Sequence, residues 1–344
     1  MAAVMGVSAP VTAGSVIAMI PESSTTSGNR LIGSPRAPSH SWYQPPASRS
    51  YAIVVDALRA GVGSSLPTNS HYLHTLGASA GTVQRAMKFL ADQRALTVTS
   101  RGHLGRTLDS LDIGAAWHLA GLTPLRLLFP PGGPVEIDVL TEALAGELTA
   151  LGVPHTVHHQ RGAARRIDAI VTGDYDLVVV SAGTLDDAAR RLESAPTLVL
   201  PPGTYYAPRR LVAVTRTAAP EPGPGARVAI DYDSPDHVLL TESAYPPDHG
   251  YVYVPCEFPG VPAAVLRSQV DVGVWHLSHT VIPLDLAGLS CTDLEDLPTA
   301  TAWRDLSAAA LVGRPRRGEL TAVLAAINLP TLTQAQRHHL RHTP

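Results

Sequence analysis

From residue 125 onward, short apolar runs alternate with longer segments whose apolar residues recur at helical spacing. The runs 125–129 and 177–180 are almost entirely apolar, which is typical of strands that are covered on both faces. Between them, Leu140, Leu144 and Leu148 fall on one face of a helix that we predict over 135–151. This order of strand and helix predicts an α/β fold, with a parallel sheet and helices on both of its faces.

The alternation continues in two units, which a Pro- and Gly-rich stretch at 218–225 separates. In the first unit we also expect strands over 156–159, 197–200 and 211–214, and helices over 162–172 and 185–192. A smaller second lobe, at about 218–278, contains predicted strands over 227–231, 251–255 and 270–275, and helices over 234–241 and 261–268. The chain then returns to the first unit through 306–311 and ends in helices over 318–327 and 333–341.

Two α/β lobes between which the chain crosses out and back predict a clamshell over 113–344. Ligands of such folds bind in the cleft between the lobes, beside the carboxyl ends of the strands. The loop 130–133 offers the N–H groups of Gly132 and Gly133 to an anion, unless it is only a tight turn. Arg161, just ahead of the helix that follows Gly162, pairs with a carboxylate or phosphate, or else is solvated.

Three further positions at the cleft carry polar or aromatic side chains. Ser181 follows the most buried strand, where its hydroxyl is available to a ligand. Ser234 is expected to cap a helix of the second lobe, and it either binds the ligand from that side or serves only as a cap. Trp275 and His276 end the last strand of that lobe, and the tryptophan either stacks on the ligand or belongs to the core. The expected ligand-binding residues are therefore Gly132, Gly133, Arg161, Gly162, Ser181, Ser234, Trp275 and His276.

Charge divides the chain differently from hydrophobicity. The segment 51–108 holds six basic and two acidic residues, a net charge of +4. Residues 109–344 have a net charge of −9, and the N-terminal residues have +2, so the whole chain has −3. The bases of the segment 51–108 are Arg59, Arg85, Lys88, Arg94, Arg101 and Arg106, and its acids are Asp56 and Asp92. A small basic module ahead of a large acidic one indicates that the small module contacts an anion.

The basic module predicts two short helices joined by a tight turn. Thr68 caps a helix that Gly77 ends, and Ser79 caps a second helix over 80–93. On the second helix, Val83, Ala86, Met87 and Leu90 form one apolar face, and Gln84, Arg85 and Lys88 lie opposite it. Helix, glycine-containing turn and second helix form a helix-turn-helix.

A short ribbon with a basic tip follows this pair of helices. Residues 96–100 predict a strand, 101–105 a glycine-bounded turn, and 106–108 the return strand. The combination is a winged helix, whose second helix enters the major groove of double-stranded DNA. Helix N-termini and arginines suit phosphate oxygens, so we assign DNA contacts to Thr68, Gln84, Arg85, Lys88, Arg101 and Arg106. The alternative is a small packed helical domain with ordinary surface arginines.

The stretch 78–90, ASAGTVQRAMKFL, resembles the recognition helix of GntR-type winged-helix regulators. The stretch 100–105, SRGHLG, resembles their wing, in the form found in the YhfZ-type branch of that group. The resemblance implies that Ser79, Gly81, Thr82, Arg85, Arg101, His103 and Gly105 contact or approach DNA. Ala80 departs from the pattern, because many of these regulators have an arginine there that reads a base. Either the sequence specificity is low, or base recognition shifts to Gln84 and Arg85.

The α/β region resembles the effector domain of YhfZ-type regulators, which is similar to the type 2 periplasmic binding fold. Three stretches carry this likeness: 161–166, 173–181 and 271–276. Together with the winged helix, the resemblance covers about residues 66–341. It implies a DNA-binding domain at 50–109 joined to a two-lobed effector domain at 113–344.

Several other classes of protein do not fit the sequence. Lys88 is the only lysine and lies in the basic module, which argues against a pyridoxal-phosphate enzyme. No phosphate-binding loop, nucleophile elbow or paired carboxylates indicate catalysis. We interpret the histidine groups at 155–159 and 338–342 as surface residues rather than as a metal site. Cys256 and Cys291 are too far apart in the sequence for a thiolate zinc site. We therefore expect no cofactor and no metal, and two reduced thiols rather than a disulfide.

The N-terminal 49 residues are rich in Ser, Pro, Ala, Gly and Thr, and we expect a disordered tail there. No apolar run predicts a membrane span, and no basic residue precedes the apolar start as a secretory signal requires. The leading hypothesis is a cytoplasmic transcriptional regulator that binds two DNA half-sites as a homodimer and responds to a small-molecule effector, with an anion among the candidates. The alternatives are an α/β enzyme and an exported solute receptor that use the same cleft.

Overall fold

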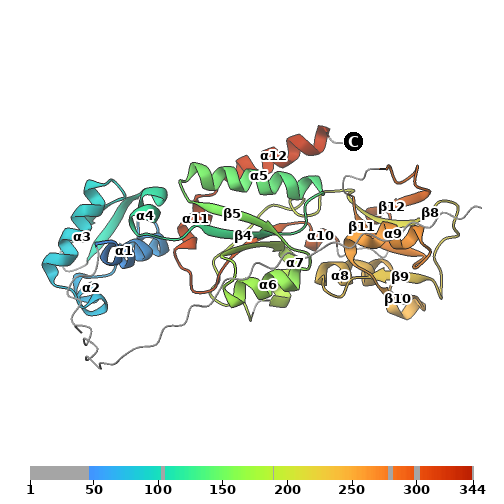
Figure 1. The fold of residues 1–344 in the computed structure, drawn as a ribbon, viewed down its shortest axis with the longest axis horizontal. Helices are drawn as coiled ribbons and strands as arrows, with labels where there is room; N and C mark the ends of the chain where they lie inside the picture. Colours follow the sequence, from blue (N-terminus) through green and yellow to red (C-terminus); the bar gives the residue numbers. More distant parts are fainter. Residues whose placement is uncertain (1–45, 102–104, 189, 278–281, 298–302, 343–344) are drawn as a thin grey trace, which may run out of the picture. The chain divides into compact units, whose positions relative to one another are not determined.

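The computed structural model describes residues 46–101, 105–188, 190–277, 282–297 and 303–342 (Figure 1). A winged helix precedes two α/β lobes, so the fold class predicted from the sequence is confirmed. Within the described residues, every helix is too short or too polar to span a lipid bilayer.

The winged helix begins earlier than the sequence indicates. Its first helix starts at Pro46, inside the stretch 1–49 that we expected to be a tail, of which residues 1–45 lie outside the described residues. Its elements are α1 (Pro46–Ala60), β1 (Ser65–Leu66), α2 (Asn69–Leu76), α3 (Ala80–Asp92), β2 (Leu96–Ser100) and β3 (Arg106–Leu111). The two-residue strand β1 is too short to leave a periodic signal, and it pairs antiparallel with β3.

The predicted helix ends of this unit are confirmed. The Thr68 hydroxyl accepts the N–H of His71, and the Ser79 hydroxyl accepts the N–H of Thr82. Gly77 ends α2 with a φ of 56°, a left-handed conformation that glycine adopts at low cost. The apolar face of α3 is buried against α1 and the ribbon, in a core built from Ile53, Leu58, Tyr72, Val83, Met87, Leu90, Leu96 and Leu108.

A short helix connects the winged helix to the first lobe. Helix α4 (Ile113–Leu119) is capped by Asp112, whose carboxylate accepts the N–H of Ala115. Trp117 is fully buried, and its indole N–H donates to the carbonyl of Thr123. The guanidinium of Arg317, from the C-terminal part of the chain, lies 5.9 Å from the centre of the Trp117 ring.

Lobe one contains a five-stranded sheet in the order β5-β4-β6-β13-β7. Its elements up to the first crossing are β4 (Leu125–Phe129), α5 (Val135–Ala150), β5 (His155–His159), α6 (Ala163–Thr172), β6 (Leu177–Ser181), α7 (Ala182–Ala188) and β7 (Thr197–Val199). The returning chain adds α10 (Trp303–Leu306), β13 (Ala309–Gly313), α11 (Leu320–Ala326) and α12 (Leu329–His342). The expectation of a purely parallel sheet is wrong, because β13 enters antiparallel between β6 and β7.

Helices cover both faces of this sheet, as predicted (Figure 1). Alternate residues of a strand point to opposite faces. Leu127 and Val179 therefore pack in the core beneath α5, whereas Leu128 and Val178 pack in the core beneath α6.

Lobe two contains a second five-stranded sheet, in the order β10-β9-β11-β8-β12. Its elements are β8 (Leu211–Arg216), β9 (Arg227–Ile230), α8 (Pro235–Ala244), η2 (Pro247–His249), β10 (Val252–Pro255), η3 (Phe258–Gly260), α9 (Val261–Leu266), β11 (Val272–His276), β12 (Leu289–Asp293) and η4 (Leu294–Asp296). The range 218–278 is too narrow for this lobe. Strand β8 pairs antiparallel with β11, and β12 pairs antiparallel with β8.

The chain therefore crosses between the lobes twice. The first crossing, residues 200–210, follows β7, and the second lies between β12 and β13. The first strand after each crossing, β8 in lobe two and β13 in lobe one, is antiparallel to its neighbour. The other central strands are parallel to one another: β4, β5 and β6 in lobe one, and β9, β10 and β11 in lobe two. This arrangement brings the carboxyl ends of the two sets of strands to the space between the lobes.

Candidate functional site

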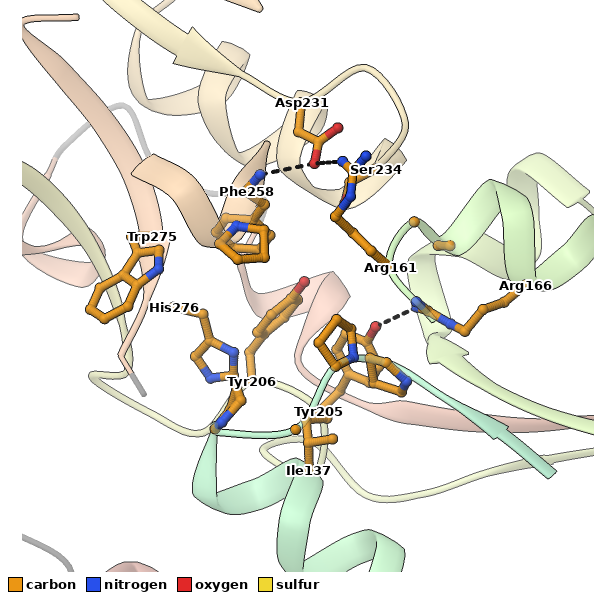
Figure 2. A pocket seen from close by; sticks show the side chains of 17 residues that line it. Ile137, Arg161, Arg166, Tyr205, Tyr206, Asp231, Ser234, Phe258, Trp275 and His276 are labelled. Atoms are coloured by element: carbon orange, nitrogen blue, oxygen red, sulfur yellow. Dashed lines mark hydrogen bonds and ion pairs between the residues drawn. The ribbon is translucent and has the colours of Figure 1, made fainter. Parts of the chain in front are cut away.

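A cavity of about 120 Å³ lies between the lobes (Figure 2). Lobe one lines it with Pro130, Pro131, Gly132, Pro134, Ile137, Arg161, Gly162, Ala163 and Arg166. The first crossing contributes Tyr205 and Tyr206, and lobe two contributes Asp231, Ser234, Phe258, Pro259, Trp275 and His276. Six residues that the sequence indicates as ligand-binding are brought together here: Gly132, Arg161, Gly162, Ser234, Trp275 and His276.

Two of the expected ligand-binding residues are not among the residues that line the cavity. The N–H of Gly133 donates to the Asp138 carboxylate, at 3.0 and 3.1 Å from its two oxygens, so the loop 130–133 is closed by its own chain. Ser181 is fully buried, and its hydroxyl donates to a carboxylate of lobe two, Asp236, at 2.6 Å.

Arg161 binds carboxylates, and they belong to the same chain. Its guanidinium donates from Nη1 to Asp231 at 2.8 Å, and from Nη2 to Asp233 at 3.4 Å. Nη2 also lies 3.1 Å from the carboxylate of Glu257. Arg165 adds a second contact to Asp233, at 2.6 Å. All of these ion pairs connect lobe one with lobe two.

Asp231 is held at the end of β9 by several hydrogen bonds. One carboxylate oxygen accepts the N–H of Phe258 as well as the Arg161 guanidinium, and the other accepts the N–H of Asp233. The backbone N–H of Asp231 donates to Nδ1 of His237, so the His237 proton resides on Nε2 and is donated to the Val274 carbonyl. Burial lowers the pKa of His237 to about 4, which keeps this imidazole neutral.

Asp236 makes a second polar contact between the lobes. The hydroxyls of Ser181, Thr184 and Tyr206 donate to its carboxylate, at 2.6, 3.1 and 3.2 Å. Burial raises the pKa of Asp236, although these hydrogen bonds and the charge of Arg166 lower it in part. The Ser181 hydroxyl, predicted to bind a ligand, is therefore used to hold the first turn of α8 against lobe one.

Glu136 and His276 form a third contact across the cleft. Glu136 is fully buried near the start of α5, and one of its oxygens accepts hydrogen bonds from His276 Nε2 and from the N–H of Ala207, both at 2.8 Å. Burial would raise the pKa of Glu136, but the charge and hydrogen bond of His276 hold it below its usual value. The ring of Tyr206 packs edge-on against His276 at 5.0 Å.

Arg166 is a cavity-lining residue that was not among the ligand-binding residues expected from the sequence. It is 2% exposed and lines the cavity. It donates from Nε to the Val179 carbonyl at 3.0 Å and from Nη1 to the Gln160 carbonyl at 2.8 Å. Its Nη2 donates to the Tyr205 hydroxyl at 2.9 Å (Figure 2). The helical spacing could have indicated that Arg166 is buried, because positions 163, 166, 167 and 170 form the buried face of α6.

The surface assigned to DNA is formed by α3 and the β2–β3 ribbon. Gln84, Arg85 and Lys88 are exposed on α3, opposite its buried face. Arg85 donates to the Thr82 hydroxyl at 3.2 Å, and Lys88 pairs with Asp92 at 3.0 Å. Neither contact removes these side chains from solvent.

The remaining DNA-binding candidates differ in their surroundings. Arg101 is exposed at the end of β2, whereas Arg106 is half-buried and donates to the Asn69 side chain at 2.7 Å. The hydroxyls of Thr68 and Ser79 are occupied as helix caps, and Gly81 and Thr82 are partly buried. His103 lies outside the described residues, together with Gly102 and Leu104.

Metal-binding and redox groups were also sought in the part of the chain that the structure describes. There, no group of three or more His, Cys, Asp or Glu side chains is arranged to hold a metal ion. Cys256 and Cys291 are both free thiols, and burial raises the pKa of each.

Comparison with known proteins follows the same division of the chain. Residues 112–343 match the family model of the YhfZ C-terminal domain, and residues 61–108 match that of a helix-turn-helix domain. The uncharacterized protein YhfZ of Escherichia coli strain K12 is 25% identical over 238 residues, which are 69% of this chain and 76% of that protein.

Solved structures are similar over about two thirds of the chain. The crystal structure of YhfZ from Shigella flexneri superposes with a TM-score of 0.52 at 19% identity, over 67% of this chain and 96% of that one. The periplasmic aliphatic sulphonate binding protein SsuA from Escherichia coli gives a TM-score of 0.43 at 17% identity, over 64% of this chain and 75% of that one.

Proposed function

Because this chain belongs to the family that the YhfZ C-terminal domain defines, and carries a helix-turn-helix domain ahead of it, we propose that it is a GntR/YhfZ-type transcriptional regulator. In this proposal the winged helix binds operator DNA, and a small metabolite bound between the lobes changes the affinity for that DNA. The cleft has no catalytic role, and the protein acts in the cytoplasm, where its DNA is.

The observation that carries the DNA-binding part is the two-sided character of α3. Val83, Met87 and Leu90 anchor one side in the core, which leaves Gln84 and Arg85 exposed on a rigid support. Polar side chains on such a helix reach base edges, and an adjacent basic ribbon contacts the phosphates. The net charge of +4 in residues 51–108 favours the same partner.

The regulatory part is supported by the polar contacts across the cleft. Arg161, Asp236 and His276 each join one lobe to the other, so the free energies of the open and closed forms depend on contacts at the cavity. A metabolite that binds one form more tightly shifts the population toward it. The shift regulates transcription when the two forms differ in DNA affinity, which we expect to arise through a homodimer on two half-sites.

The DNA-binding part is tested by fluorescence anisotropy of the full chain with the DNA upstream of its own gene. We expect the affinity to fall steeply as salt rises, because bound phosphates release counterions. The double variant Arg85→Ala/Arg101→Ala should weaken binding. Loss of the Arg101 phosphate contact should reduce the salt slope by about one per subunit, and loss of the Arg85 base contact should cost about 1–3 kcal/mol.

The matched control removes the same charge from the α/β lobes. Arg190 and Arg267 are exposed there, and their double alanine variant should bind DNA as the wild type does. Equal binding by the Arg85→Ala/Arg101→Ala variant and the wild type, or binding that does not depend on salt, would refute the DNA-binding proposal.

A further inference from the structure

The cavity is bordered by a buried cation that has no carboxylate partner. The guanidinium of Arg166 carries five N–H donors, and the three hydrogen bonds that it makes end on two backbone carbonyls and the neutral Tyr205 hydroxyl. Among the described residues, no carboxylate oxygen lies within 4.0 Å of it. The buried carboxylate of Asp236 acts on this charge only from a longer distance. A buried charge without an ion-pair partner is costly, so this position favours an anion.

The N-terminus of α6 opens onto the cavity at the same place. Its N-cap residue, Gly162, has a φ of 84° and no side chain to accept the first N–H groups, and no acidic residue occurs in the first turn. Gly162 and Ala163 both line the cavity. The free N–H groups and the helix dipole are positive here, and Arg166, itself in the first turn, adds a like charge. Both features would be stabilised by one anion.

The other charges at the cavity are already matched. Arg161 and Arg165 pair with Asp231, Asp233 and Glu257. Asp231, the carboxylate that lines the cavity, accepts hydrogen bonds on both oxygens and has little to offer a ligand cation. Asp236 is bound by Ser181, Thr184 and Tyr206 and is not among the lining residues. Among the charged residues that line the cavity, Arg166 is the cation with no carboxylate in contact, and Asp236 opposes its charge only at longer range.

A large part of the cavity wall is apolar. Ile137 and the prolines of the loop after β4 line it on lobe one, and Phe258, Pro259 and Trp275 line it on lobe two (Figure 2). Such a wall favours a hydrocarbon or aromatic body over a second charged group. The volume of about 120 Å³ is close to that of an engineered cavity that holds benzene, about 150 Å³.

We propose that the cleft binds a small organic monoanion, whose charged group is held by Arg166 and the N-terminus of α6 and whose apolar body packs against Phe258 and Trp275. The inference rests on the proposed function, because it names the chemical class of the effector. A carboxylate on a body of about six non-hydrogen atoms fits the cavity volume. A cation held by the rings of Tyr205, Tyr206, Phe258 and Trp275 is the competing ligand class, and the buried Arg166 disfavours it.

The test compares three size-matched probes on the full wild-type chain: benzoate, benzamide and benzylamine. Binding is measured by calorimetry, and the shift in melting temperature at millimolar probe is measured in parallel. We expect benzoate to bind at least tenfold more tightly than benzamide, and benzylamine not to bind. Equal or tighter binding of the amide or the amine, or no binding of benzoate, overturns the proposal. Because these measurements use the wild type, they do not depend on whether a variant folds.

Two variants assign the discrimination to Arg166. Arg166→Gln removes the cation and should reduce the ratio of benzoate to benzamide affinity at least tenfold, toward one. Arg191→Gln removes an exposed arginine of the same lobe that pairs with Asp168, and should leave the ratio unchanged. An unchanged ratio in a folded Arg166→Gln variant would place the anion elsewhere and overturn the assignment.

Failure of this inference is distinguishable from failure of the proposed function. DNA binding with steep salt dependence but without benzoate binding leaves the regulator in place and removes the ligand class. Benzoate binding without DNA binding keeps the ligand class and removes the regulator.

Discussion

Acidification should destabilise lobe two through His237, a neutral imidazole that is fully buried between Asp231 and β11. Its Nδ1 accepts the Asp231 N–H, and its Nε2–H donates to the Val274 carbonyl. A second proton on Nδ1 would place one N–H against another and bury a charge that only the carboxylate of Asp231 opposes. Protonation is therefore easier in the unfolded chain than in the folded one.

The size of the effect follows from the two pKa values. The pKa of His237 is about 4 in the folded protein and 6.5 when exposed. Because the folded value is the lower one, the stabilisation is complete above pH 6.5 and is lost as the pH falls from 6.5 to 4. At 1.36 kcal/mol for each pH unit, the loss is about 2 kcal/mol between pH 7 and pH 5, and about 3 kcal/mol in full.

Other buried groups titrate near this window, so the effect must be isolated by difference. Asp236 has a raised pKa, and its protonation stabilises the folded state as the pH falls, which opposes His237. Glu136 and Asp176 have lowered pKa values, and their contributions are lost below the usual range of a carboxyl group. His237→Asn keeps an acceptor near the Asp231 N–H and removes only the titrating ring.

The assay is urea denaturation at pH 7 and pH 5 of the wild type and of His237→Asn. The free energy of unfolding should fall by about 2 kcal/mol more in the wild type than in the variant over this interval. His249→Asn, a change at an exposed position of the same lobe, should behave as the wild type does. Equal pH dependence of wild type and His237→Asn would refute the inference that the imidazole is held neutral by burial.

Two further changes test the packing and the contact between the lobes. A Cβ on Gly273 would lie 2.7 Å from both the Ala229 Cβ and a Val261 methyl group. Gly273→Ala should therefore lower the free energy of unfolding, measured by urea denaturation, by about 1–3 kcal/mol. An unchanged denaturation midpoint would contradict this packing. Arg161→Gln removes a hydrogen-bond donor from the buried Asp231 carboxylate, so the free energy of unfolding should fall by about 1–3 kcal/mol. Because this contact joins the lobes, the radius of gyration measured by X-ray scattering should increase. If both quantities stay at their wild-type values, Arg161 does not join the lobes in solution.

Local signals in the sequence were sufficient for most of the elements. The caps Thr68, Ser79 and Ser234 and the leucine spacing of α5 fix helices through contacts between neighbours in the chain. The positions of β8, β12 and β13 were not predictable in this way. Each of these strands enters its sheet antiparallel, beside a strand distant in sequence, and that pairing leaves no periodic signal.

The cleft was predictable where a rule about strand ends applies. Arg161, Ser234 and His276 were found because each follows a strand or caps a helix at the expected edge. Tyr205 lies in a crossing and Phe258 begins the 3-10 helix η3, and the sequence offers no comparable rule for either position. Ser181 stands at the right strand end, but its partner is Asp236, 55 residues later, and only contact between the lobes brings the two together.

The attachment of the winged helix limits how a ligand can act on DNA binding. Arg317 pairs with Asp176 of lobe one at 2.6 Å and also contacts Trp117 of α4, and α1 packs against α11. The winged helix thus shares contacts with lobe one, whereas lobe two contacts lobe one through the cleft. Within the proposed function, we therefore expect closure of the cleft to move lobe two while these contacts of the winged helix stay in place. On that expectation, the proposed regulation acts through the proposed homodimer, in which the position of lobe two would set the spacing of the two recognition helices.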